Sequence, residues 1–207
     1  ILIGDSASNV MAGNADTLPI TVDQMIYHAR SVARACQHAF VVCDMPFGSY
    51  QISKEEALRN ACRMMKETGV DALKLEGGVE ICETVKALVN AGIPVHGHLG
   101  LTPQSVNKFG GYGIRAKEEA EAQKLISDAI ALDEAGCFAI VLEKVPAKLA
   151  AEVSKKVKAV TIGIGAGNGC DGQVLVYADA LGMTQGFKPK FPVSYTHLRA
   201  HETVLDL

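Results

Sequence analysis

The sequence predicts a parallel α/β fold and, within that class, a (β/α)8 barrel of the TIM type. Short apolar runs of strand length alternate with amphipathic segments of helix length, which is the pattern of repeated βα units. Several apolar runs also end in a charged or imidazole side chain, and the active site of such a barrel is built from the carboxyl ends of its strands. These strand-end residues are Asp5, Asp44, Lys74, Glu76, His98 and Glu143.

A doubly wound sheet is the competing architecture. It would carry a G-x-G-x-x-G fingerprint after its first strand. The glycines of segment 163–169 are instead spaced two residues apart, and they come late in the chain. The barrel therefore explains more of the sequence.

Seven strands and five helices can be assigned in order. The strands are predicted over residues 1–6, 40–44, 71–76, 95–99, 138–143, 160–164 and 172–177. The helices are predicted over residues 21–36, 53–69, 79–90, 118–135 and 146–156. Thr21 and Gln24 form a capping-box signature for the first helix, and Gly69 is placed to end the second. The loop over residues 100–117 is long enough for a lid, and the eighth strand of a closed barrel is not found.

Composition narrows the class of protein. The chain has 207 residues, of which 48% are hydrophobic, so it suits one domain with a large core. A net charge of −3 without a long basic run argues against nucleic acid and anionic membrane surfaces as partners. The apolar runs are too short to span a bilayer, and no signal peptide is visible. Six scattered cysteines without a Cys-x-x-Cys pair indicate reduced thiols in a cytoplasmic protein.

The stretch Ala72–Gly78 shows how a strand end can carry chemistry. Side chains two apart on a strand share a face, so Lys74 and Glu76 point the same way. A weak, solvated ion pair is the simpler interpretation of these two residues. The recurrence of acids at the ends of other strands favours a shared site instead.

The residue types in this predicted site suggest carbon–carbon bond chemistry next to a carbonyl. Converging carboxylates repel one another and need a cation, and oxygen ligands suit Mg²⁺. A bound Mg²⁺ polarises a ketone, and Lys74 is placed to hold a carboxylate or an oxyanion. Glu143 follows an apolar run, which favours a role as general base.

Each of these residues also has a structural interpretation. Asp5 and Asp44 could cap helices or form turns, and Glu143 could pair with Lys144 on the surface. We interpret His98 as a polar residue of the active site. For His96, packing and a role in the site are equally consistent with the sequence.

Taken together, the motifs resemble those of the ketopantoate hydroxymethyltransferase family, from Ile1 to about Phe191. The matching segments are Ile3–Ser6, Thr17–Pro19, Asp44–Phe47, Lys74–Gly78, Gly97–Gln104 with Gly110–Tyr112, Val141–Glu143 with Val145–Pro146, and Ile162–Asn168 with Asp171–Gln173. The resemblance implies a (β/α)8 barrel. It also implies transfer of a hydroxymethyl group from 5,10-methylenetetrahydrofolate to 3-methyl-2-oxobutanoate, giving 2-dehydropantoate in pantothenate biosynthesis.

The resemblance also assigns roles to the strand-end residues. Asp5 and Asp44 match the metal ligands of the family, and Glu76 matches a third acid that reaches the metal through water. Glu143 matches the proposed proton acceptor, which implies a reaction through an Mg²⁺-stabilised enolate. The positions that match contacts to the keto acid are Asp5, Ser6, Asp44, Lys74 and His98. As partners, the resemblance implies a small 2-oxo acid, a folate and further copies of the chain, in a cytoplasmic homo-oligomer that is often a decamer.

The chain departs from the family pattern at both ends. The family carries a further strand and helix before Ile1, and more helix where its pattern stops near Pro192. We therefore expect residues 1–192 to be a partial barrel and residues 193–207 to be a non-native tail. We also expect this polypeptide alone to fold poorly or to lack activity, because an open barrel exposes strand edges.

Three alternatives to the transferase remain at this point. One is an Mg²⁺-dependent lyase or mutase that acts on small 2-oxo acids without folate. Another is a Schiff-base aldolase with Lys74 as the nucleophile, which would require a depressed pKa for this lysine. The third is a fragment in which truncation has disabled the site.

Overall fold

The structure, a computed structural model, describes residues 1–183, and these residues form a parallel α/β half-barrel. One sheet holds seven strands in the order of the chain, and every neighbouring pair is parallel. The strands are β1 (Leu2–Ile3), β2 (Val42–Asp44), β3 (Ala72–Glu76), β4 (Val95–Gly100), β5 (Ala139–Glu143), β6 (Val160–Ile164) and β7 (Gly172–Gln173). Within the described residues β1 and β7 do not pair, so this wall is open.

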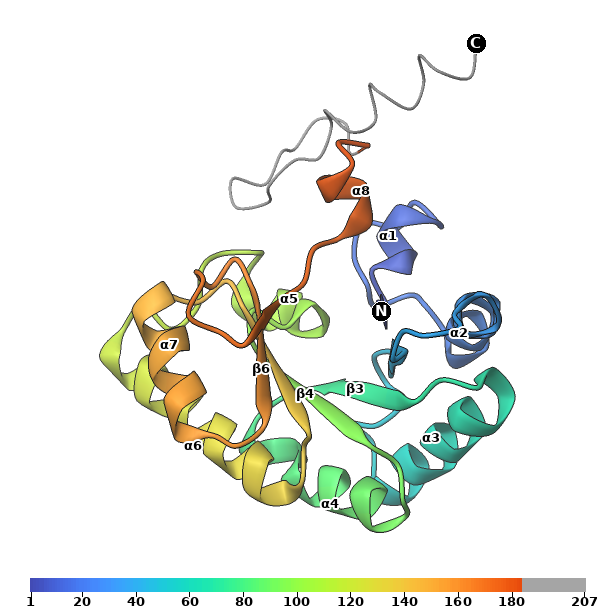
Figure 1. The fold of residues 1–207 in the computed structure, drawn as a ribbon, viewed down its shortest axis with the longest axis horizontal. Helices are drawn as coiled ribbons and strands as arrows, with labels where there is room; N and C mark the ends of the chain where they lie inside the picture. The colour runs from blue at the N-terminus through green and yellow to red at the C-terminus, as the bar shows by residue number, and fades with distance from the viewer. Residues whose placement is uncertain (184–207) are drawn as a thin grey trace.

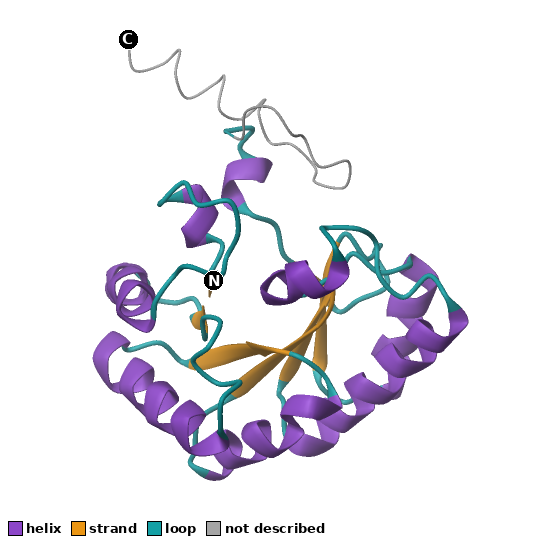
Figure 2. Cartoon of the chain, turned by 180° about the vertical axis from the view of Figure 1, so that it is seen from behind, coloured by secondary structure: helices purple, strands orange, loops and turns teal. Residues whose placement is uncertain are grey.

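The long helices form an outer row around the curved sheet (Figure 1). Figure 2 shows the same row from behind, with the strands on its inner side. The helices of this row are α2 (Val22–Ala35), α3 (Lys54–Thr68), α4 (Cys82–Asn90), α6 (Glu119–Ala135) and α7 (Ala147–Lys156). The short helices are α1 (Ala7–Val10), η1 (Val79–Ile81), η2 (Pro103–Ser105), α5 (Val106–Phe109) and α8 (Tyr177–Ala180). Among the described residues, no helix is both long enough and apolar enough to cross a bilayer.

The predicted helix boundaries of α2 and α3 are confirmed by their caps. The Thr21 hydroxyl accepts the backbone N–H of Gln24, and the Gln24 side chain accepts the backbone N–H of Thr21. Ser53 caps α3 in the same way, through the N–H of Glu56. Gly69 ends α3 with a φ of 77°, a left-handed conformation that glycine adopts without steric cost.

Strand β3 shows where the core lies. Leu73 and Leu75 are fully buried on the face that packs against the helices, and each contributes about 1.5–3 kcal/mol through burial. Lys74 and Glu76, on the opposite face, are 4% and 7% exposed. The sheet therefore separates an apolar layer under the helices from a buried polar layer on its inner face.

Four predicted segments differ from the structure. The strands predicted over residues 1–6 and 172–177 are each only two residues long, and α8 begins where the second of them was expected to end. The segment after Ser6, to which the sequence assigned no helix, contains α1, and the predicted long loop over residues 100–117 contains η2 and α5. Helices of one turn carry too little apolar periodicity to be recognised from sequence. The predicted tail, residues 193–207, lies outside the described residues.

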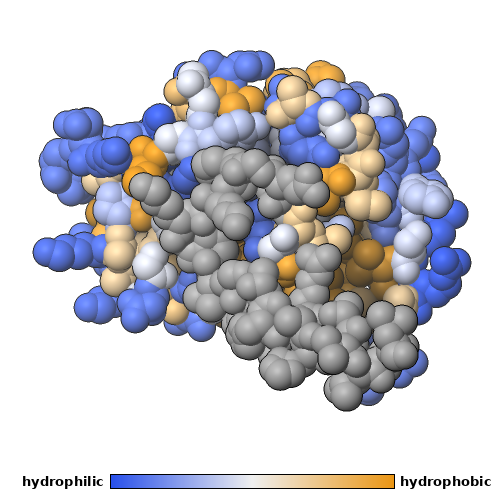
Figure 3. Space-filling view, turned by 90° about the horizontal axis from the view of Figure 1, so that it is seen from above, coloured by the Kyte–Doolittle hydropathy of each residue, from blue (hydrophilic) through white to orange (hydrophobic). Residues whose placement is uncertain are grey.

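Helices α1 and α8 lie side by side at one end of the half-barrel (Figures 1 and 2), with the Tyr177 hydroxyl 3.9 Å from the Met11 sulfur. Figure 3 looks onto this end from above and shows hydrophobic side chains between hydrophilic ones. Both helices contribute exposed apolar residues, which are Val10, Met11, Tyr177 and Leu181.

Candidate active site

The carboxyl ends of the first five strands bring the predicted site residues together. In the sheet register Asp44 lies opposite Lys74, and Glu76 lies opposite His98. Glu143 ends β5 and lies opposite Gly100 on β4. The cluster that forms, called the acid cluster below, consists of Asp5, Asp44, Lys74, Glu76, His98 and Glu143.

Lys74 provides the cluster with a buried cation. Its Nζ lies 3.1 Å from Asp44 Oδ1 and 3.1 Å from His98 Nδ1. Burial alone would lower the pKa of Lys74, but the Asp44 and Glu76 carboxylates outweigh it and raise the pKa above its usual value. Lys74 therefore stays a charged ammonium, which disfavours the Schiff-base alternative.

His98, on β4, lies between two carboxylates that come from the strands on either side of it, β3 and β5. Its Nδ1 lies 3.2 Å from Glu76 Oε1, and its Nε2 lies 3.2 Å from Glu143 Oε2. Burial and the Lys74 charge oppose protonation of the ring, but Glu143 and Glu76 outweigh them and raise the pKa of His98 to about 9. At neutral pH His98 is a second cation, held between Glu76 and Glu143.

Asp5 and Asp44 form a close pair of acids. The backbone N–H of Asp5 donates to Asp44 Oδ2 at 3.1 Å. Burial, with repulsion from Asp44 and Glu76, raises the pKa of Asp5 to about 8. Burial also raises the pKa of Asp44, with Lys74 acting in the opposite direction. For Glu76, burial favours the neutral acid, but His98 and Lys74 outweigh it and the pKa is lowered.

The charges of the cluster fit a divalent cation. Four carboxylates share the site with two cationic side chains, so two negative charges are unbalanced when all of the groups are ionised. Repulsion from Asp44 and Glu76 adds to the effect of burial in raising the pKa of Asp5. Among residues 1–183, no group of three or more acidic, imidazole or thiol side chains is arranged to hold a metal by itself. Mg²⁺ does not need such a cage, because it binds one or two carboxylates and keeps water or substrate oxygens as its other ligands.

Two buried residues complete the network, and the sequence did not single them out. The Gln104 side chain donates to Asp5 Oδ2 at 2.8 Å, and its backbone N–H donates to Glu76 Oε2 at 2.9 Å. The Tyr50 hydroxyl lies 2.7 Å from Gln104 Oε1 and accepts the backbone N–H of Glu76. Gln104 ends one of the matching motifs, which was the available signal, whereas no motif marked Tyr50.

Ser6 and His96 lie beside the acid cluster. Ser6 directly follows Asp5 at the start of α1 and is half-buried, and its contact with substrate stays a prediction. His96 points to the same face of β4 as His98, but it lies two residues earlier and so farther from the carboxyl end of the strand. Its ring packs on Phe138 with centroids 5.6 Å apart, which favours packing over a role in the site.

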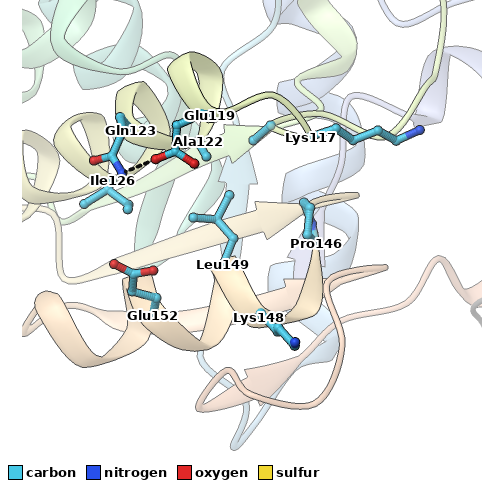
Figure 4. A pocket seen from close by; sticks show the side chains of 10 residues that line it. Lys117, Glu119, Ala122, Gln123, Ile126, Pro146, Lys148, Leu149 and Glu152 are labelled. Atoms are coloured by element: carbon cyan, nitrogen blue, oxygen red, sulfur yellow. Dashed lines mark hydrogen bonds between the residues drawn. The ribbon is translucent and has the colours of Figure 1, made fainter.

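A groove of about 260 Å³ opens on the outer side of the half-barrel, between α6 and α7 (Figure 4). Leu149, Ile126 and Pro146 give it apolar walls, and Glu119, Glu152 and Lys148 line its rim. No residue of the acid cluster lines it, so this groove is separate from the candidate active site.

Comparison with known proteins identifies close relatives in sequence. The sequence pattern of a family described as ketopantoate hydroxymethyltransferase matches residues 1–204. A 3-methyl-2-oxobutanoate hydroxymethyltransferase from Christiangramia forsetii is 63% identical over 203 residues, covering 98% of this chain and 75% of the relative. The protein of the same name from Parabacteroides distasonis is 62% identical, covering 96% of this chain and 72% of the relative.

Solved structures resemble the chain in fold. A 2,3-dimethylmalate lyase of the PEP mutase/isocitrate lyase superfamily has a TM-score of 0.56 at 15% identity, covering 97% of this chain and 70% of that protein. An orotidine 5′-monophosphate decarboxylase from Methanocaldococcus jannaschii has a TM-score of 0.53 at 13% identity, covering 88% and 80%. At these identities the likeness concerns the parallel α/β fold alone.

Proposed function

Because the chain belongs to the ketopantoate hydroxymethyltransferase family, we propose that its acid cluster transfers a hydroxymethyl group to 3-methyl-2-oxobutanoate. The family uses a one-carbon folate as donor, and we take this donor to be 5,10-methylenetetrahydrofolate. The observation that carries the proposal is the convergence of four carboxylates and two cations at the strand ends. A site of this kind suits removal of a proton next to a carbonyl.

Asp5 and Asp44 are the residues we propose as direct ligands of Mg²⁺. Glu76 Oε2 accepts the Gln104 backbone N–H, whereas Oε1 lies 3.2 Å from His98 Nδ1 and has no hydrogen-bond partner among the described residues, which supports a contact to the ion through water. When bound, the ion supplies positive charge that acidifies the C3 proton of the keto acid.

Glu143 is the residue we propose to remove that proton. It is half-buried at the end of β5, and its Oε2 lies 3.2 Å from His98 Nε2. Among the described residues, none donates a hydrogen bond to the other oxygen, Oε1, which can therefore approach a substrate carbon. The charged pair with His98 orients the carboxylate before the substrate arrives.

Lys74 is proposed to balance negative charge on the substrate without forming a covalent bond to it. Its ammonium faces the same interior as the acids and stays protonated. Water adds to the methylene carbon of the folate, the two C–N bonds of that carbon break, and tetrahydrofolate leaves the one-carbon unit behind as formaldehyde. C3, which has lost its proton to Glu143, bonds to this carbon, and the proton held by Glu143 passes to the new alkoxide to give the hydroxyl group. Ser6, at the same rim, is proposed to contact the keto acid.

Cytoplasmic location and assembly into a homo-oligomer, such as a decamer, are also part of the proposal. The family resemblance supports both. Sedimentation velocity of the full chain measures its oligomeric state. A monomer at micromolar concentration would contradict the proposed homo-oligomer.

The experiment that tests the proposed chemistry is proton NMR of 3-methyl-2-oxobutanoate in D₂O with the full chain, which means this chain extended to the length of its relatives. We expect loss of the C3 proton signal with Mg²⁺, and no loss with a chelator, even without folate. If the C3 proton still exchanged in the presence of the chelator, the proposed role of the metal would be wrong. If the C3 proton did not exchange with Mg²⁺, nor after tetrahydrofolate was added, the proposed function would be wrong. Covalent trapping of substrate by borohydride would instead indicate the Schiff-base alternative.

A further inference from the structure

The side chain of Gln104 uses all the hydrogen-bonding capacity of its amide. Its Nε2 donates to Asp5 Oδ2 at 2.8 Å and to the carbonyl of Met45 at 2.9 Å. Its Oε1 accepts from the Tyr50 hydroxyl at 2.7 Å and from Gln51 Nε2 at 3.0 Å. An amide offers two N–H donors and two acceptor positions, so these four contacts fix which way the group faces.

These contacts join parts of the site that are far apart in the chain. Asp5 follows β1 and is 99 residues away, and Met45 follows β2 and is 59 residues away. The backbone N–H of Gln104 also reaches Glu76, at the end of β3. One residue, 6% exposed, therefore ties together the ends of three strands.

The contact to Asp5 has a directional consequence. Among the described residues, Gln104 is the donor that holds the Asp5 carboxylate, and it holds only Oδ2. Because the two oxygens of a carboxylate have a fixed geometry, holding Oδ2 also sets the direction in which Oδ1 points. A neutral amide orients the acid without adding charge, whereas a glutamate at position 104 would repel it and an apolar residue would leave buried polar atoms unpaired.

We propose that Gln104 is a positioning residue, whose amide orients the Asp5 carboxylate for a divalent cation and is itself held by Tyr50. The inference rests on the proposed function, because it assumes that Asp5 binds the ion. It adds to that function a residue outside the set of ligands and of substrate contacts. Outer partners of this kind typically change metal affinity or activity about 10- to 100-fold when they are removed.

The test compares Mn²⁺ binding by the full chain and by Gln104→Met, using titration calorimetry. Methionine has a similar length but no amide, so the change removes the side-chain bonds and keeps the backbone N–H to Glu76. We expect the Kd for Mn²⁺ to rise about 10- to 100-fold. Gln123→Met is the matched control, because Gln123 is exposed and, within residues 1–183, its side chain bonds only Glu119 on the outer helix α6. Its Kd should equal that of the wild type.

A second readout separates positioning from a purely structural role. If Gln104 acts on metal geometry, saturating Mn²⁺ should restore most of the C3 exchange rate in Gln104→Met, so that the metal KM changes more than kcat. A lower melting temperature with an unchanged Kd would overturn the inference. If the wild type itself binds no Mn²⁺, the proposed function fails first. Equal binding by wild type and variant would defeat the inference alone.

Tyr50→Phe covers the outcome in which Gln104→Met does not fold. This change removes the 2.7 Å bond to Gln104 Oε1, while Gln51 still holds that oxygen, and it also removes the acceptor of the Glu76 backbone N–H. We therefore expect a smaller rise in the Kd for Mn²⁺ than for Gln104→Met. An unchanged Kd in folded Tyr50→Phe would overturn the proposed chain from Tyr50 through Gln104 to Asp5.

Discussion

His96 and His98 lie two residues apart on β4 and face the same interior, yet their environments differ in charge. His98 sits between Glu76 and Glu143, which raise its pKa to about 9 against the opposing effects of burial and Lys74. His96 has no carboxylate partner among the described residues, and burial with the Lys74 charge lowers its pKa to about 3. Two histidines that are two residues apart on one strand therefore differ in charge, one protonated and the other neutral.

The same contrast holds between the two ends of the sheet. At the carboxyl end the polar groups are linked into one network. Toward the amino end Phe138 packs edge-on against Phe40 with centroids 5.5 Å apart, and the His96 ring also packs on Phe138. In barrels of this class the carboxyl end carries chemistry and the amino end carries stability. Substitutions at the two ends should therefore separate activity from stability.

The largest effect should come from Glu143→Gln at the carboxyl end. The amide keeps the size of the side chain but cannot accept the C3 proton. We expect the rate of C3 exchange to fall about 100- to 10,000-fold, the usual range for a general base. Proton NMR in D₂O measures the rate. The melting temperature should also fall, because the buried His98 loses one of its two carboxylate partners.

Glu152→Gln is the matched control for this prediction. Glu152 is exposed on α7 and pairs with Lys156 at 3.1 Å, so its change should leave the exchange rate at the wild-type value. Turnover of Glu143→Gln at the wild-type rate would show that another group is the base.

The next largest effect should be on stability, from Gly100→Ala at the end of β4. Gly100 has a φ of 89°, and a Cβ there would lie 2.3 Å from the carbonyl oxygen of Glu143. That oxygen accepts the N–H of Leu101, which starts the turn leading to Gln104. Steric overlap and backbone strain together should lower the free energy of unfolding by about 3 kcal/mol or more, measured by urea denaturation.

Gly110→Ala provides the control for backbone conformation alone. Its φ is 69°, but a Cβ there would meet no atom within 4 Å. We expect a cost of about 1 kcal/mol, the penalty for a left-handed alanine. Equal costs at Gly100 and Gly110 would mean that the close approach of β4 to β5 does not constrain the site.

The alternation of strands and helices could be predicted from sequence, because period and caps are local properties. The acid cluster could be predicted as well, because parallel strands bring their carboxyl ends to one edge. Gln104 could not be assigned a role, since its partner Asp5 is 99 residues away and nothing local records that contact. The two histidines could not be separated either. A period of two places both on one face, and the depth that distinguishes them arises from packing against Phe138.

The pH dependence of stability should show the two histidines acting in opposite directions. The pKa of His98 is raised above the ordinary 6.5, so its stabilising contribution is complete below 6.5 and is lost as the pH rises toward 9. The pKa of His96 is lowered, so its contribution is present above 6.5 and is lost as the pH falls toward 3. Each group changes the free energy of unfolding by at most about 1.4 kcal/mol per pH unit.

Urea unfolding of metal-free His96→Leu and wild type, between about pH 4 and pH 9, measures this contrast. The substitution should flatten the acid side of the profile, because leucine has no proton to take up. The alkaline side should keep the slope that His98 gives it. Asp5, whose pKa is raised from 3.8 to about 8, lowers the stability of both proteins as the pH rises between these values, so its contribution cancels when the variant is compared with the wild type. A change confined to the alkaline side would reverse the roles assigned to the two rings.

The smallest effect should come from Phe138→Leu at the amino end. Leucine keeps apolar volume but loses the ring contacts to Phe40 and His96, and aromatic pairs contribute about 0.5–1.5 kcal/mol beyond burial. We expect the free energy of unfolding to fall by about 1 kcal/mol and the C3 exchange rate to stay unchanged. Phe47→Leu is the control, since Phe47 is 49% exposed and makes no ring contact among the described residues. A fall in exchange rate for Phe138→Leu at unchanged stability would show that the amino end communicates with the acid cluster, and the division between the two ends would then be wrong.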